Sequence, residues 1–370
     1  MIIKKKIGVF STSRSDFGIL SPLIEEIKKN NFFKLFLFVG GDHFLYENSL
    51  KNLNANLKVD SSFDYISKNF FFDYKEFSKS TSIINIKLQK IFKNYNFDYT
   101  LILGDRHELI PIIHHSIILN KKIIHIGGGE ITEGAIDNKI RYMISSIADY
   151  QFTMHNNYKN NLIENKLINQ KIYNVGYLGV DNIKKINFIK KKDIFRKYKI
   201  DTQKKLAMFT YHPSICEINI KTIRVLKSIL RFTLAQNYQI IVSFPGVELK
   251  NYKIKNMILD FKNTKDLFIF PNLGFKDYNN LLKYSDFVFG NSSSGIIEAP
   301  FYKIPSINIG DRQQGRIRHI SVLDCDLNLA NFKEKLQILK KNAFKTQLKK
   351  MNYKFGKGKT AKKIIKYLLN

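Results

Sequence analysis

Three carboxylates and one imidazole in this chain have the chemistry that proton transfer at carbon requires. They are Asp105, Glu130, Asp137 and His212. Asp105 and His212 follow apolar runs, Glu130 follows three glycines, and Asp137 stands in a helical pattern. A side chain of this kind can remove a proton from carbon or return one when it lies within hydrogen-bond reach. The set therefore predicts acid–base catalysis.

Each of these residues also has a simpler interpretation. Asp105 could form an ion pair with its neighbour Arg106, and Asp137 stands four residues before Arg141, the spacing of a salt bridge on a helix surface. His212 precedes a proline, and a lone histidine there is more often structural. What favours catalysis is that several such groups occur at the ends of expected strands.

A run of small residues in the second half of the chain has the features of a diphosphate site. The segment FGNSSSGIIEAP, residues 289–300, indicates a strand, a tight turn and a helix start. Backbone amides and the positive end of a helix favour a negatively charged group there. The candidate nucleotide-binding residues are Asn291, Ser292, Ser293, Ser294 and Gly295, with Glu298 for the ribose hydroxyls. A serine N-cap followed by an ordinary first-turn glutamate is the alternative.

Arginines near two other expected strand ends complete the candidate set. The segment GDRQQGR, residues 310–316, carries Arg312 and Arg316, and Arg14 follows the first apolar run. The planar guanidinium fork suits phosphate contacts, so we expect Arg312 or Arg316 to assist the diphosphate. A basic surface turn is the alternative for both.

Parallel sheets would bring these residues together. Apolar runs alternate with helical patterns and occupy residues 7–10, 35–39, 99–103, 123–126, 206–209, 240–244, 267–270, 287–289 and 306–309. This alternation predicts an α/β protein whose sheets are covered by helices on both faces. In doubly wound sheets, ligands bind beyond the carboxyl ends of the strands, which is where the candidate residues fall.

The chain is long enough for two domains. With 370 residues it exceeds what a single core usually supports. We expect an N-terminal domain over residues 1–178 that holds the carboxylates and a nucleotide-binding domain over 179–355. We expect residues 356–370 to form a helix that docks back on the first domain. Apolar residues between Ile19 and Ile27 predict another helix, with Pro22 in its first turn.

Composition narrows the partners and the location. The net charge of +30 comes from lysines spread along the chain, without a basic arm interleaved with aromatic residues, so nucleic acid is not expected as a partner. Cys216 and Cys325 are too few for a disulfide framework, which favours a reducing cytoplasm. No apolar run is long enough to cross a membrane, and no histidine spacing suggests a metal.

In family order, the motifs resemble those of the hydrolysing UDP-N-acetylglucosamine 2-epimerases, in the branch that feeds sialic and legionaminic acid synthesis. The motifs that carry the resemblance are STSRSDFG (11–18), LGDRHE (103–108), HIGGGEITEGAIDNKIR (125–141), YHP (211–213), GNSSSGIIEAP (290–300) and INIGDRQQGRIR (307–318). The resemblance implies two Rossmann-like doubly wound domains in a GT-B arrangement, with the active site in the cleft between them. It also implies a homodimer and a reaction that needs no cofactor or metal.

The resemblance also implies roles for residues. Asp105 and Asp137 match acidic positions implicated in catalysis, Arg14 and His212 match polar positions near the substrate, and Arg141 is expected to pair with Asp137. Ser292 to Ser294 and Glu298 match the diphosphate and ribose contacts. Many relatives carry Glu or His where this chain has Gly127, so Glu130 is the candidate for the missing proton-transfer group.

The implied reaction converts UDP-N-acetylglucosamine, or a related nucleotide-linked 2-acetamido sugar, to a free N-acetylmannosamine-type sugar and a nucleoside diphosphate. It proceeds by elimination to a glycal, followed by hydration. Three alternatives stay open: a non-hydrolysing 2-epimerase, a GT-B glycosyltransferase, and a basic nucleic-acid-binding protein that would explain the charge of +30.

Overall fold

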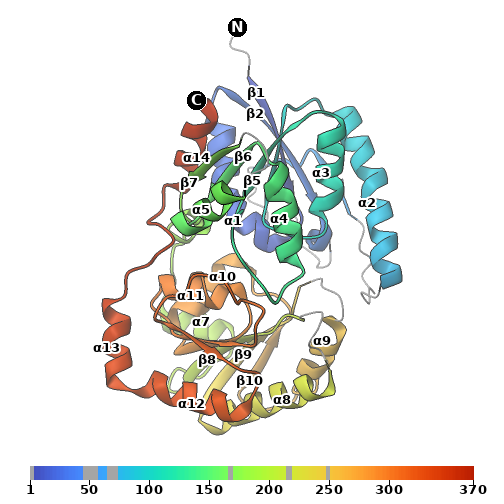
Figure 1. The fold of residues 1–370 in the computed structure, drawn as a ribbon. Helices are drawn as coiled ribbons and strands as arrows, with labels where there is room; N and C mark the ends of the chain where they lie inside the picture. The colour runs from blue at the N-terminus through green and yellow to red at the C-terminus, as the bar shows by residue number, and fades with distance from the viewer. Residues whose placement is uncertain (1–3, 45–56, 65–73, 166–169, 214–218, 247–250) are drawn as a thin grey trace. The chain divides into compact units, whose positions relative to one another are not determined.

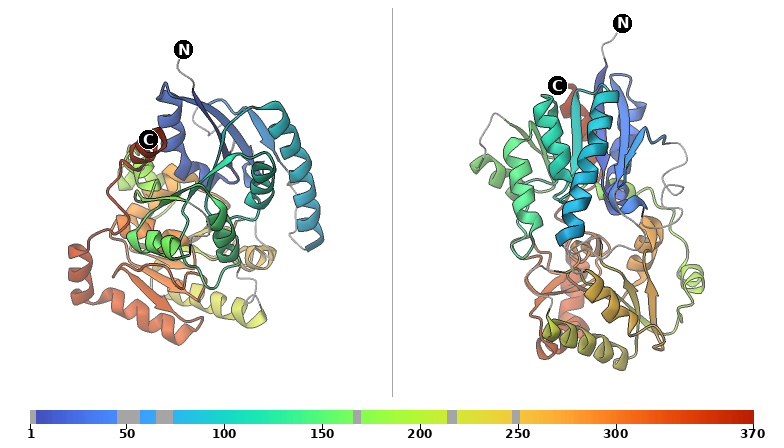
Figure 2. Two further views of the ribbon diagram at one scale, coloured as in Figure 1. Left: turned by 45° about the horizontal axis from the view of Figure 1, so that its top comes forward. Right: turned by 90° about the vertical axis from the view of Figure 1, so that its right-hand side faces the viewer.

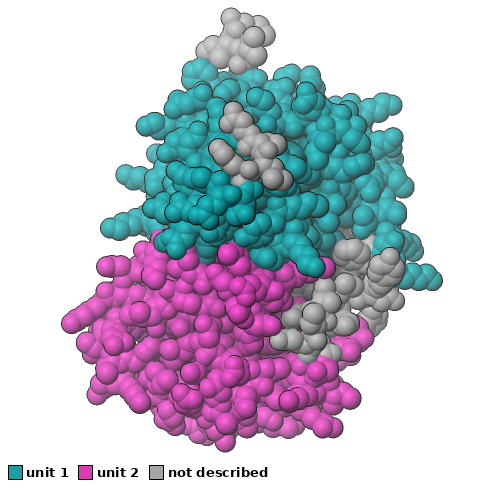
Figure 3. Space-filling model, viewed as in Figure 1, with its two compact units in different colours: residues 1–130, 137–185, 355–370 teal, residues 131–136, 186–354 magenta. Residues whose placement is uncertain are grey.

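The computed structural model describes residues 4–44, 57–64, 74–165, 170–213, 219–246 and 251–370 (Figure 1). They form two compact units, which are coloured separately in Figure 3. Unit 1 comprises residues 1–130, 137–185 and 355–370, and unit 2 comprises residues 131–136 and 186–354. The chain thus leaves the first unit after residue 185, seven residues beyond the expected boundary at 178, and returns to it at residue 355.

Unit 1 is built on a sheet of seven described strands in the order β3-β2-β1-β4-β5-β6-β7, and neighbouring strands run parallel. The strands are β1 (Lys5–Ser11), β2 (Phe33–Gly40), β3 (Ser61–Phe63), β4 (Tyr99–Leu103), β5 (Lys122–Ile126), β6 (Tyr150–Thr153) and β7 (Lys171–Asn174). The helices are α1 (Arg14–Lys29), the 3-10 turn η1 (Gly41–Phe44), α2 (Tyr74–Asn94), α3 (Leu109–Ile118), α4 (Asp137–Ile147), α5 (Asn156–Glu164), α6 (Gly179–Ile183) and α14 (Thr360–Leu369).

The central strand β1 is buried on both faces. Ile7 pairs in register with Leu35 on one side and with Tyr99 on the other. Residues from Ile7 to Ser11 are all buried, as is typical of a parallel strand covered by helices on both faces. The helix that follows begins where the hydroxyl of Ser13 accepts a hydrogen bond from the backbone N–H of Asp16 (3.0 Å), a standard N-cap.

Unit 2 is built on a sheet of six described strands in the order β10-β9-β8-β11-β12-β13, also parallel. The strands are β8 (Lys205–Thr210), β9 (Tyr238–Ser243), β10 (Leu267–Phe270), β11 (Phe287–Gly290), β12 (Ser306–Ile309) and β13 (Val322–Cys325). The helices are α7 (Lys191–Lys197), α8 (Ile220–Ala235), α9 (Asn251–Leu259), α10 (Gly274–Tyr284), η2 (Ser293–Gly295), α11 (Glu298–Phe301), α12 (Leu329–Lys340) and α13 (Asn342–Lys350).

Alternate residues of the unit 2 strands feed two separate cores. Phe209 and Phe289 join one apolar cluster, together with side chains of α8 and α12. Met208 and Val288, one position earlier on the same strands, join a second cluster with side chains of α7 and α10. Because side chains alternate across a strand, each strand serves both faces of the sheet. The result is a rigid sheet edge from which the loops of the candidate site emerge.

The C-terminal helix α14 belongs to unit 1. Asp181 caps its N-terminus, since its two carboxylate oxygens accept from the backbone N–H groups of Thr360 (3.1 Å) and Ala361 (2.8 Å). Ile364 and Leu368 are buried in the same cluster as Leu20 of α1. Figures 1 and 2 show this red helix next to the blue N-terminal elements.

Each sheet reverses its winding at one point. In unit 1 the reversal lies between β1 and β4, and in unit 2 between β8 and β11. Loops diverge there and leave room for a ligand beyond the carboxyl ends of the strands. Of the helices that the structure describes, none has the length and apolarity needed to span a bilayer.

Candidate functional site

In unit 1, three sequence-predicted residues lie at the point where the winding reverses. Arg14 opens α1 directly after β1, Asp105 follows β4, and Glu130 follows β5. These strands are adjacent in the sheet, so one sheet edge carries all three residues. The structure therefore gathers the unit 1 candidates as their positions after strands predicted.

Arg141 organises two of these residues. Its Nη2 forms an ion pair with Oδ2 of Asp105, and its Nη1 donates to the backbone carbonyl of Glu130 (2.8 Å). The side chain of Arg141 is only 2% exposed, whereas that of Asp105 is 21% exposed. A buried guanidinium must be paired. Here the pairing holds the partly exposed carboxylate of Asp105 at the sheet edge. The Asp105 partner lies thirty-six positions away in the sequence, beyond what the spacing on α4 could indicate.

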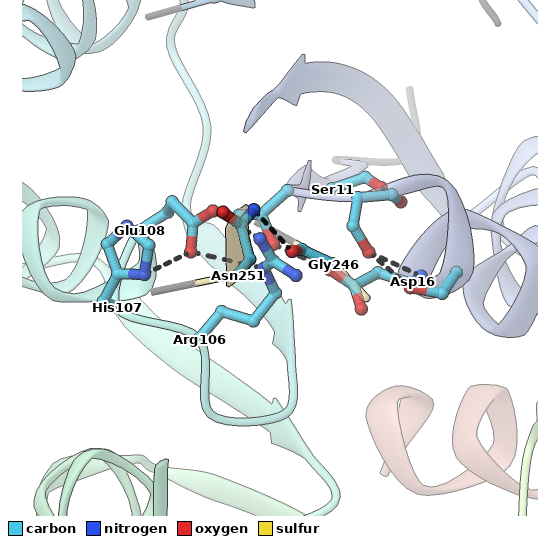
Figure 4. A network of polar contacts seen from close by, with 10 residues as sticks. Ser11, Asp16, Arg106, His107, Glu108, Gly246 and Asn251 are labelled. Atoms are coloured by element: carbon cyan, nitrogen blue, oxygen red, sulfur yellow. Dashed lines mark hydrogen bonds and ion pairs between the residues drawn. The ribbon is translucent and has the colours of Figure 1, made fainter. Parts of the chain in front are cut away.

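Arg106 has a different carboxylate partner from the one its position suggested. Its Nη2 and Nε donate to the two oxygens of Glu108 (2.7 and 3.2 Å), and Nδ1 of His107 lies 3.2 Å from the same carboxylate. Figure 4 shows Glu108 beside His107, with Arg106 nearby. Glu108 is fully buried, so this group fixes the turn after β4. The carboxylate of Asp105 is thereby left to Arg141.

Glu130 reaches the position that Gly127 leaves open. Gly127 has φ +89°, and a Cβ built on it would lie 3.8 Å from Oε1 of Glu130. Glu130 is itself 6% exposed. The carboxylate of Glu130 thus lies next to the position that the Cβ of another residue type at 127 would occupy.

Asp137 is the first residue of α4 and is half-buried. A carboxylate in the first turn of a helix is stabilised by the helix dipole. Asp137 and Arg141 stand one turn apart on this helix, so α4 joins Asp137 to the Asp105 pair through the backbone.

His43 is a polar residue of this region that the sequence analysis missed. It lies in η1 after β2, is fully buried, and its Nε2 is 2.9 Å from Oγ of Ser11. Burial, and then the charges of Arg14 and Arg106, lower its pKa to about 3. His43 is therefore neutral near pH 7. Its position directly after a strand was the available signal, the same one that singled out Asp105.

His125 supports the turn before Asp105. Its Nε2 donates to the carbonyl of Gly104 (2.8 Å), and its Nδ1 is 3.1 Å from Gln151. Burial lowers the pKa of His125 to about 4, so the imidazole is neutral near pH 7. Gly104 has φ +81°, a conformation that glycine adopts without strain.

In unit 2, the predicted residues also follow adjacent strands. His212 follows β8, the run from Asn291 to Gly295 follows β11, and the segment with Arg312 follows β12. Gly290 permits the closest approach, because it has φ +123° and a Cβ there would lie 1.9 Å from the carbonyl oxygen of Thr210. These loops form a second cluster at the reversal of this sheet.

Asn291 holds three of these loops together. Its Oδ1 accepts from the backbone N–H of His212 (2.6 Å), and its Nδ2 donates to the His212 carbonyl (2.9 Å). The backbone carbonyl of Asn291 accepts from Nη1 of Arg312 (3.1 Å) and Nε2 of Gln313 (2.9 Å). Since its side chain is taken up by the His212 peptide, Asn291 serves the loop geometry rather than direct contact with a nucleotide.

The serine loop presents polar groups at the sheet edge. Ser292 caps η2, because its Oγ accepts from the backbone N–H of Ser294 (3.3 Å). Ser292, Ser293, Ser294 and Gly295 are all half-buried. Glu298 opens α11, one turn further on, and is also half-buried.

The two remaining arginines differ in environment. Arg316 is half-buried in the loop after β12. Arg318, at the same strand edge, pairs with both carboxylate oxygens of Asp324 (3.1 Å each). Arg318 therefore has a structural partner on β13. The part of the chain that the structure describes contains no group of three or more His, Cys, Asp or Glu residues that could hold a metal ion.

A family model described as UDP-N-acetylglucosamine 2-epimerase matches residues 25–369. The chain belongs to this family. This match confirms the resemblance found in the motifs. It also confirms the expectation that the chain belongs to an enzyme family acting on nucleotide sugars.

Two relatives within the 2-epimerase family cover most of the chain. A GDP/UDP-N,N'-diacetylbacillosamine 2-epimerase (hydrolyzing) of Campylobacter jejuni is 31% identical over 331 residues, 88% of this chain and 85% of the relative. A UDP-N,N'-diacetylbacillosamine 2-epimerase (hydrolyzing) of Legionella pneumophila is 28% identical over 371 residues, 99% of this chain and 96% of the relative.

Solved 2-epimerase structures have the same fold. The UDP-GlcNAc 2-epimerase of Neisseria meningitidis, bound to UDP-GlcNAc, has a TM-score of 0.83 at 16% identity and covers 98% of this chain and 99% of that one. The UDP-GlcNAc 2-epimerase of Methanocaldococcus jannaschii, in complex with UDP-GlcNAc and UDP, has a TM-score of 0.82 at 18% identity, with coverage of 98% and 99%. The predicted fold class of two Rossmann-like doubly wound domains is confirmed.

Proposed function

We propose that this protein is a hydrolysing 2-epimerase. It converts a nucleoside diphosphate 2-acetamido sugar and water to the free 2-epimeric sugar and the nucleoside diphosphate. The single observation that carries the proposal is the Asp105–Arg141–Glu130 arrangement, in which one buried guanidinium holds both the Asp105 carboxylate and the backbone carbonyl of Glu130. Proton transfer at carbon needs carboxylates that are fixed in this way.

The first half of the reaction is an elimination. A base takes the proton from C2 of the sugar, the C1–O bond breaks, and the nucleoside diphosphate leaves with the bonding electron pair, giving a glycal. The base must be ionised, and an adjacent guanidinium favours an ionised carboxylate. We therefore assign the C2 proton to Asp105.

The second half is a hydration. Water attacks C1 and loses a proton, while C2 receives a proton on the face opposite to the one that lost it. Glu130 and Asp137 are the two further carboxylates of unit 1, and we assign them to activating the water and delivering the proton. His43, neutral and 2.9 Å from Ser11, supports the backbone after β1.

The unit 2 cluster supplies the nucleotide site in this proposal. The serine loop offers hydroxyls and backbone amides to a diphosphate, and Arg312 and Arg316 add positive charge. Glu298 accepts from ribose hydroxyls. The carboxyl ends of β8, β11 and β12 at the sheet reversal are where doubly wound sheets bind ligands, which supports this assignment.

For the sugar, we rank UDP-N,N'-diacetylbacillosamine first and UDP-N-acetylglucosamine second. The motif resemblance alone favoured UDP-N-acetylglucosamine. The two relatives at 31% and 28% identity bear names that specify the diacetamido sugar, which changes the order. Both substrates share the 2-acetamido group and the C2–H bond that the proposed chemistry breaks.

The test is proton NMR of the purified protein in deuterated water with each nucleotide sugar in turn: UDP-N,N'-diacetylbacillosamine, its GDP-linked form and UDP-N-acetylglucosamine. We expect free 2-epimeric sugar carrying deuterium at C2, together with stoichiometric nucleoside diphosphate. The Asp105→Asn variant is the control for a contaminating activity.

Other products would point elsewhere. An epimer still linked to the nucleotide would make the protein a non-hydrolysing epimerase. Conversion that required an added sugar acceptor would make it a glycosyltransferase. Failure of all three substrates, in a protein shown to be folded, would overturn the proposal.

A further inference from the structure

The serine loop in unit 2 is held by a tyrosine to which no sequence motif drew attention. Tyr278 lies in α10, and its phenol donates a hydrogen bond to Oγ of Ser294 at 2.6 Å. The two residues are sixteen positions apart. Helix α10 packs beneath the loop from a different part of the chain, so the contact is tertiary rather than local.

The direction of this hydrogen bond decides what Ser294 can do next. A serine hydroxyl has one hydrogen to donate and two lone pairs with which to accept. The phenol of Tyr278 occupies one lone pair, which leaves the Ser294 hydrogen to point elsewhere. Within the described residues, the hydroxyl of Ser294 has no recorded acceptor for that hydrogen. A hydroxyl that already accepts a bond is also a better donor, because hydrogen bonds in a chain polarise one another.

The phenol is itself kept as a donor. Burial, together with the nearby negative charge of Glu298, raises the pKa of Tyr278 above its ordinary value. The phenol therefore remains protonated across the neutral range. Its helix is fixed as well, since Oη of Tyr302 donates to Oδ1 of the neighbouring Asn279 (3.0 Å), and Asn279 is buried.

The loop is also held by Ser306. Its hydroxyl donates to the carbonyl of Gly295 (2.7 Å) from strand β12. A small pocket next to the loop has Tyr278, Gly295 and Ser306 among its lining residues. The loop is thus supported by a residue of a helix and by a residue of a strand.

We propose that Tyr278 is a positioning residue that orients the hydroxyl of Ser294 as a donor to the diphosphate of the nucleotide. The inference rests on the proposed function of the serine loop as the nucleotide site and adds the residue that sets its hydrogen-bond polarity. Tyr278 acts through Ser294 and makes no bond to the ligand itself.

The test is binding of UDP to the full-length protein by calorimetry, in a double-mutant cycle of Tyr278→Phe and Ser294→Ala. Each single change is expected to weaken UDP binding by about 10- to 100-fold, the loss of one hydrogen bond to a charged group. The double variant should bind UDP no more weakly than Ser294→Ala alone, because the phenol acts only through that hydroxyl. Ser294→Thr, which keeps the hydroxyl, should restore most of the affinity.

The matched control is Tyr284→Phe on the same helix. The phenol of Tyr284 donates to the backbone carbonyl of Ile189 (2.8 Å) and has no contact with the loop. This variant should lower the melting temperature about as much as Tyr278→Phe while leaving UDP affinity unchanged. If the melting temperature of Tyr278→Phe is much lower than that of the control, the UDP affinities of Ser294→Ala and Ser294→Thr are compared instead. Equal affinities of these two variants would overturn the inference.

The outcomes separate this inference from the proposed function. If the wild type binds UDP and Tyr278→Phe binds it equally well, the inference is wrong and the nucleotide site stands. Additive losses in the double variant would also overturn it. If the wild type binds neither UDP nor GDP, the proposed nucleotide site fails and this inference fails with it.

Discussion

Arg141 contacts Asp105 and Glu130, and neither contact could be predicted from the sequence. The i, i+4 spacing on α4 suggested an ion pair on the helix surface, whereas the guanidinium is 2% exposed and pairs with Asp105 from a distant part of the sequence. Residue type and position after a strand were sufficient to select Asp105 and Glu130, whereas Arg141 was selected by its spacing from Asp137 on a helix. Their pairing depends on how α4 packs against the turn after β4, which is tertiary and leaves no local trace.

The carboxylates of unit 1 can be tested one at a time. Asp105→Asn and Asp137→Asn should each lower kcat by 100-fold or more, about 3 kcal/mol in the barrier, because an amide cannot take up the proton. Binding of UDP should stay within about 2-fold of wild type, since the proposed diphosphate contacts belong to unit 2. Steady-state kinetics and calorimetry measure the two effects separately.

Asp193→Asn is the control, because Asp193 lies in a surface ion pair with Arg196 whose two side chains are 36% and 82% exposed. It should leave kcat unchanged. Wild-type turnover in both carboxylate variants would contradict the mechanism.

Two buried histidines give stability a defined pH dependence. The pKa values of His43 and His125 are lowered to about 3 and about 4, whereas in the unfolded chain both are near 6.5. Below pH 6.5 the unfolded state therefore binds protons that the folded state does not, so stability falls as pH falls towards 4. Each histidine should cost about 2 kcal/mol between pH 6.5 and pH 5, as measured by urea unfolding.

Replacing one of the two histidines measures how much it contributes to the pH dependence of stability. His125→Gln should be less stable at pH 7, because the bond to Gly104 is altered, but should lose about 2 kcal/mol less on going to pH 5. His114→Gln, at an exposed position of α3, is the control and should follow the wild-type curve. An unchanged pH dependence in His125→Gln would show that its imidazole is not the group that resists protonation.

Element by element, strands with an apolar run were predicted well and strands with polar side chains were not. The expected strands at residues 7–10, 99–103 and 123–126 match β1, β4 and β5 closely. Strands β6 and β7 were not expected. They have four residues each and carry polar side chains such as Gln151 and Asn174, so their apolar pattern is weak. Their pairing in register with a neighbouring strand decides their conformation.

Helix α1 shows where a local rule was overridden. Pro22 was expected in the first turn, but the Ser13 cap starts the helix at Arg14 and places Pro22 in its interior. Proline lacks the N–H that would bond the carbonyl four residues earlier, here that of Gly18. That carbonyl instead accepts from Nδ2 of Asn182 (2.5 Å), a residue of α6. The expectation was wrong because the compensating donor lies 164 positions away.

This compensation predicts a specific stability effect. Asn182→Ala should lower the free energy of unfolding by about 1 to 2 kcal/mol, because it leaves the Gly18 carbonyl with only the long hydrogen bond from Oγ of Ser21 (3.4 Å). In a Pro22→Ala background the backbone N–H is restored, so the same change should cost less than half as much. Denaturant unfolding of the four proteins measures the coupling.

Asn165→Ala is the control, since the exposed amide of Asn165 also donates to a helix carbonyl, that of Asn161 (2.8 Å). It should cost a few tenths of a kcal/mol in both backgrounds. An equal cost of Asn182→Ala with and without Pro22 would show that the amide does not replace the missing backbone donor.

At the scale of the whole molecule, two units could be predicted from chain length, but the residues that belong to each could not. Residues 131–136 belong to unit 2 although Glu130 and Asp137 on either side belong to unit 1. The backbone N–H of Glu133 donates to the carbonyl of Gln314 (3.0 Å), and Gly134 packs so closely on Asp311 that a Cβ would lie 2.6 Å from its carboxylate. Such contacts are set by tertiary packing, and composition shows no break at either end of the segment.

Unit 1 exposes aliphatic side chains on three neighbouring helices, and we propose that they form the interface of the expected homodimer. Ile86 on α2, Ile110 and Ile117 on α3 and Met143 on α4 are 60%, 40%, 54% and 41% exposed. Exposed aliphatic residues gathered on one surface commonly mark an interface between proteins. If two copies meet through this surface, light scattering after gel filtration should give twice the chain mass of 43.3 kDa. Ile117→Glu should then shift the protein to the monomer, because it would bury an unpaired charge.

The control for this prediction is Ile220→Glu, at a residue of α8 that is 72% exposed and lies in unit 2. A charge there should leave the mass unchanged, because the proposed interface involves unit 1 alone. A monomeric wild type would contradict the proposed homodimer. A dimer that persists in Ile117→Glu would instead move the interface away from α3. Either result bears on assembly only, since the proposed chemistry uses residues of a single chain.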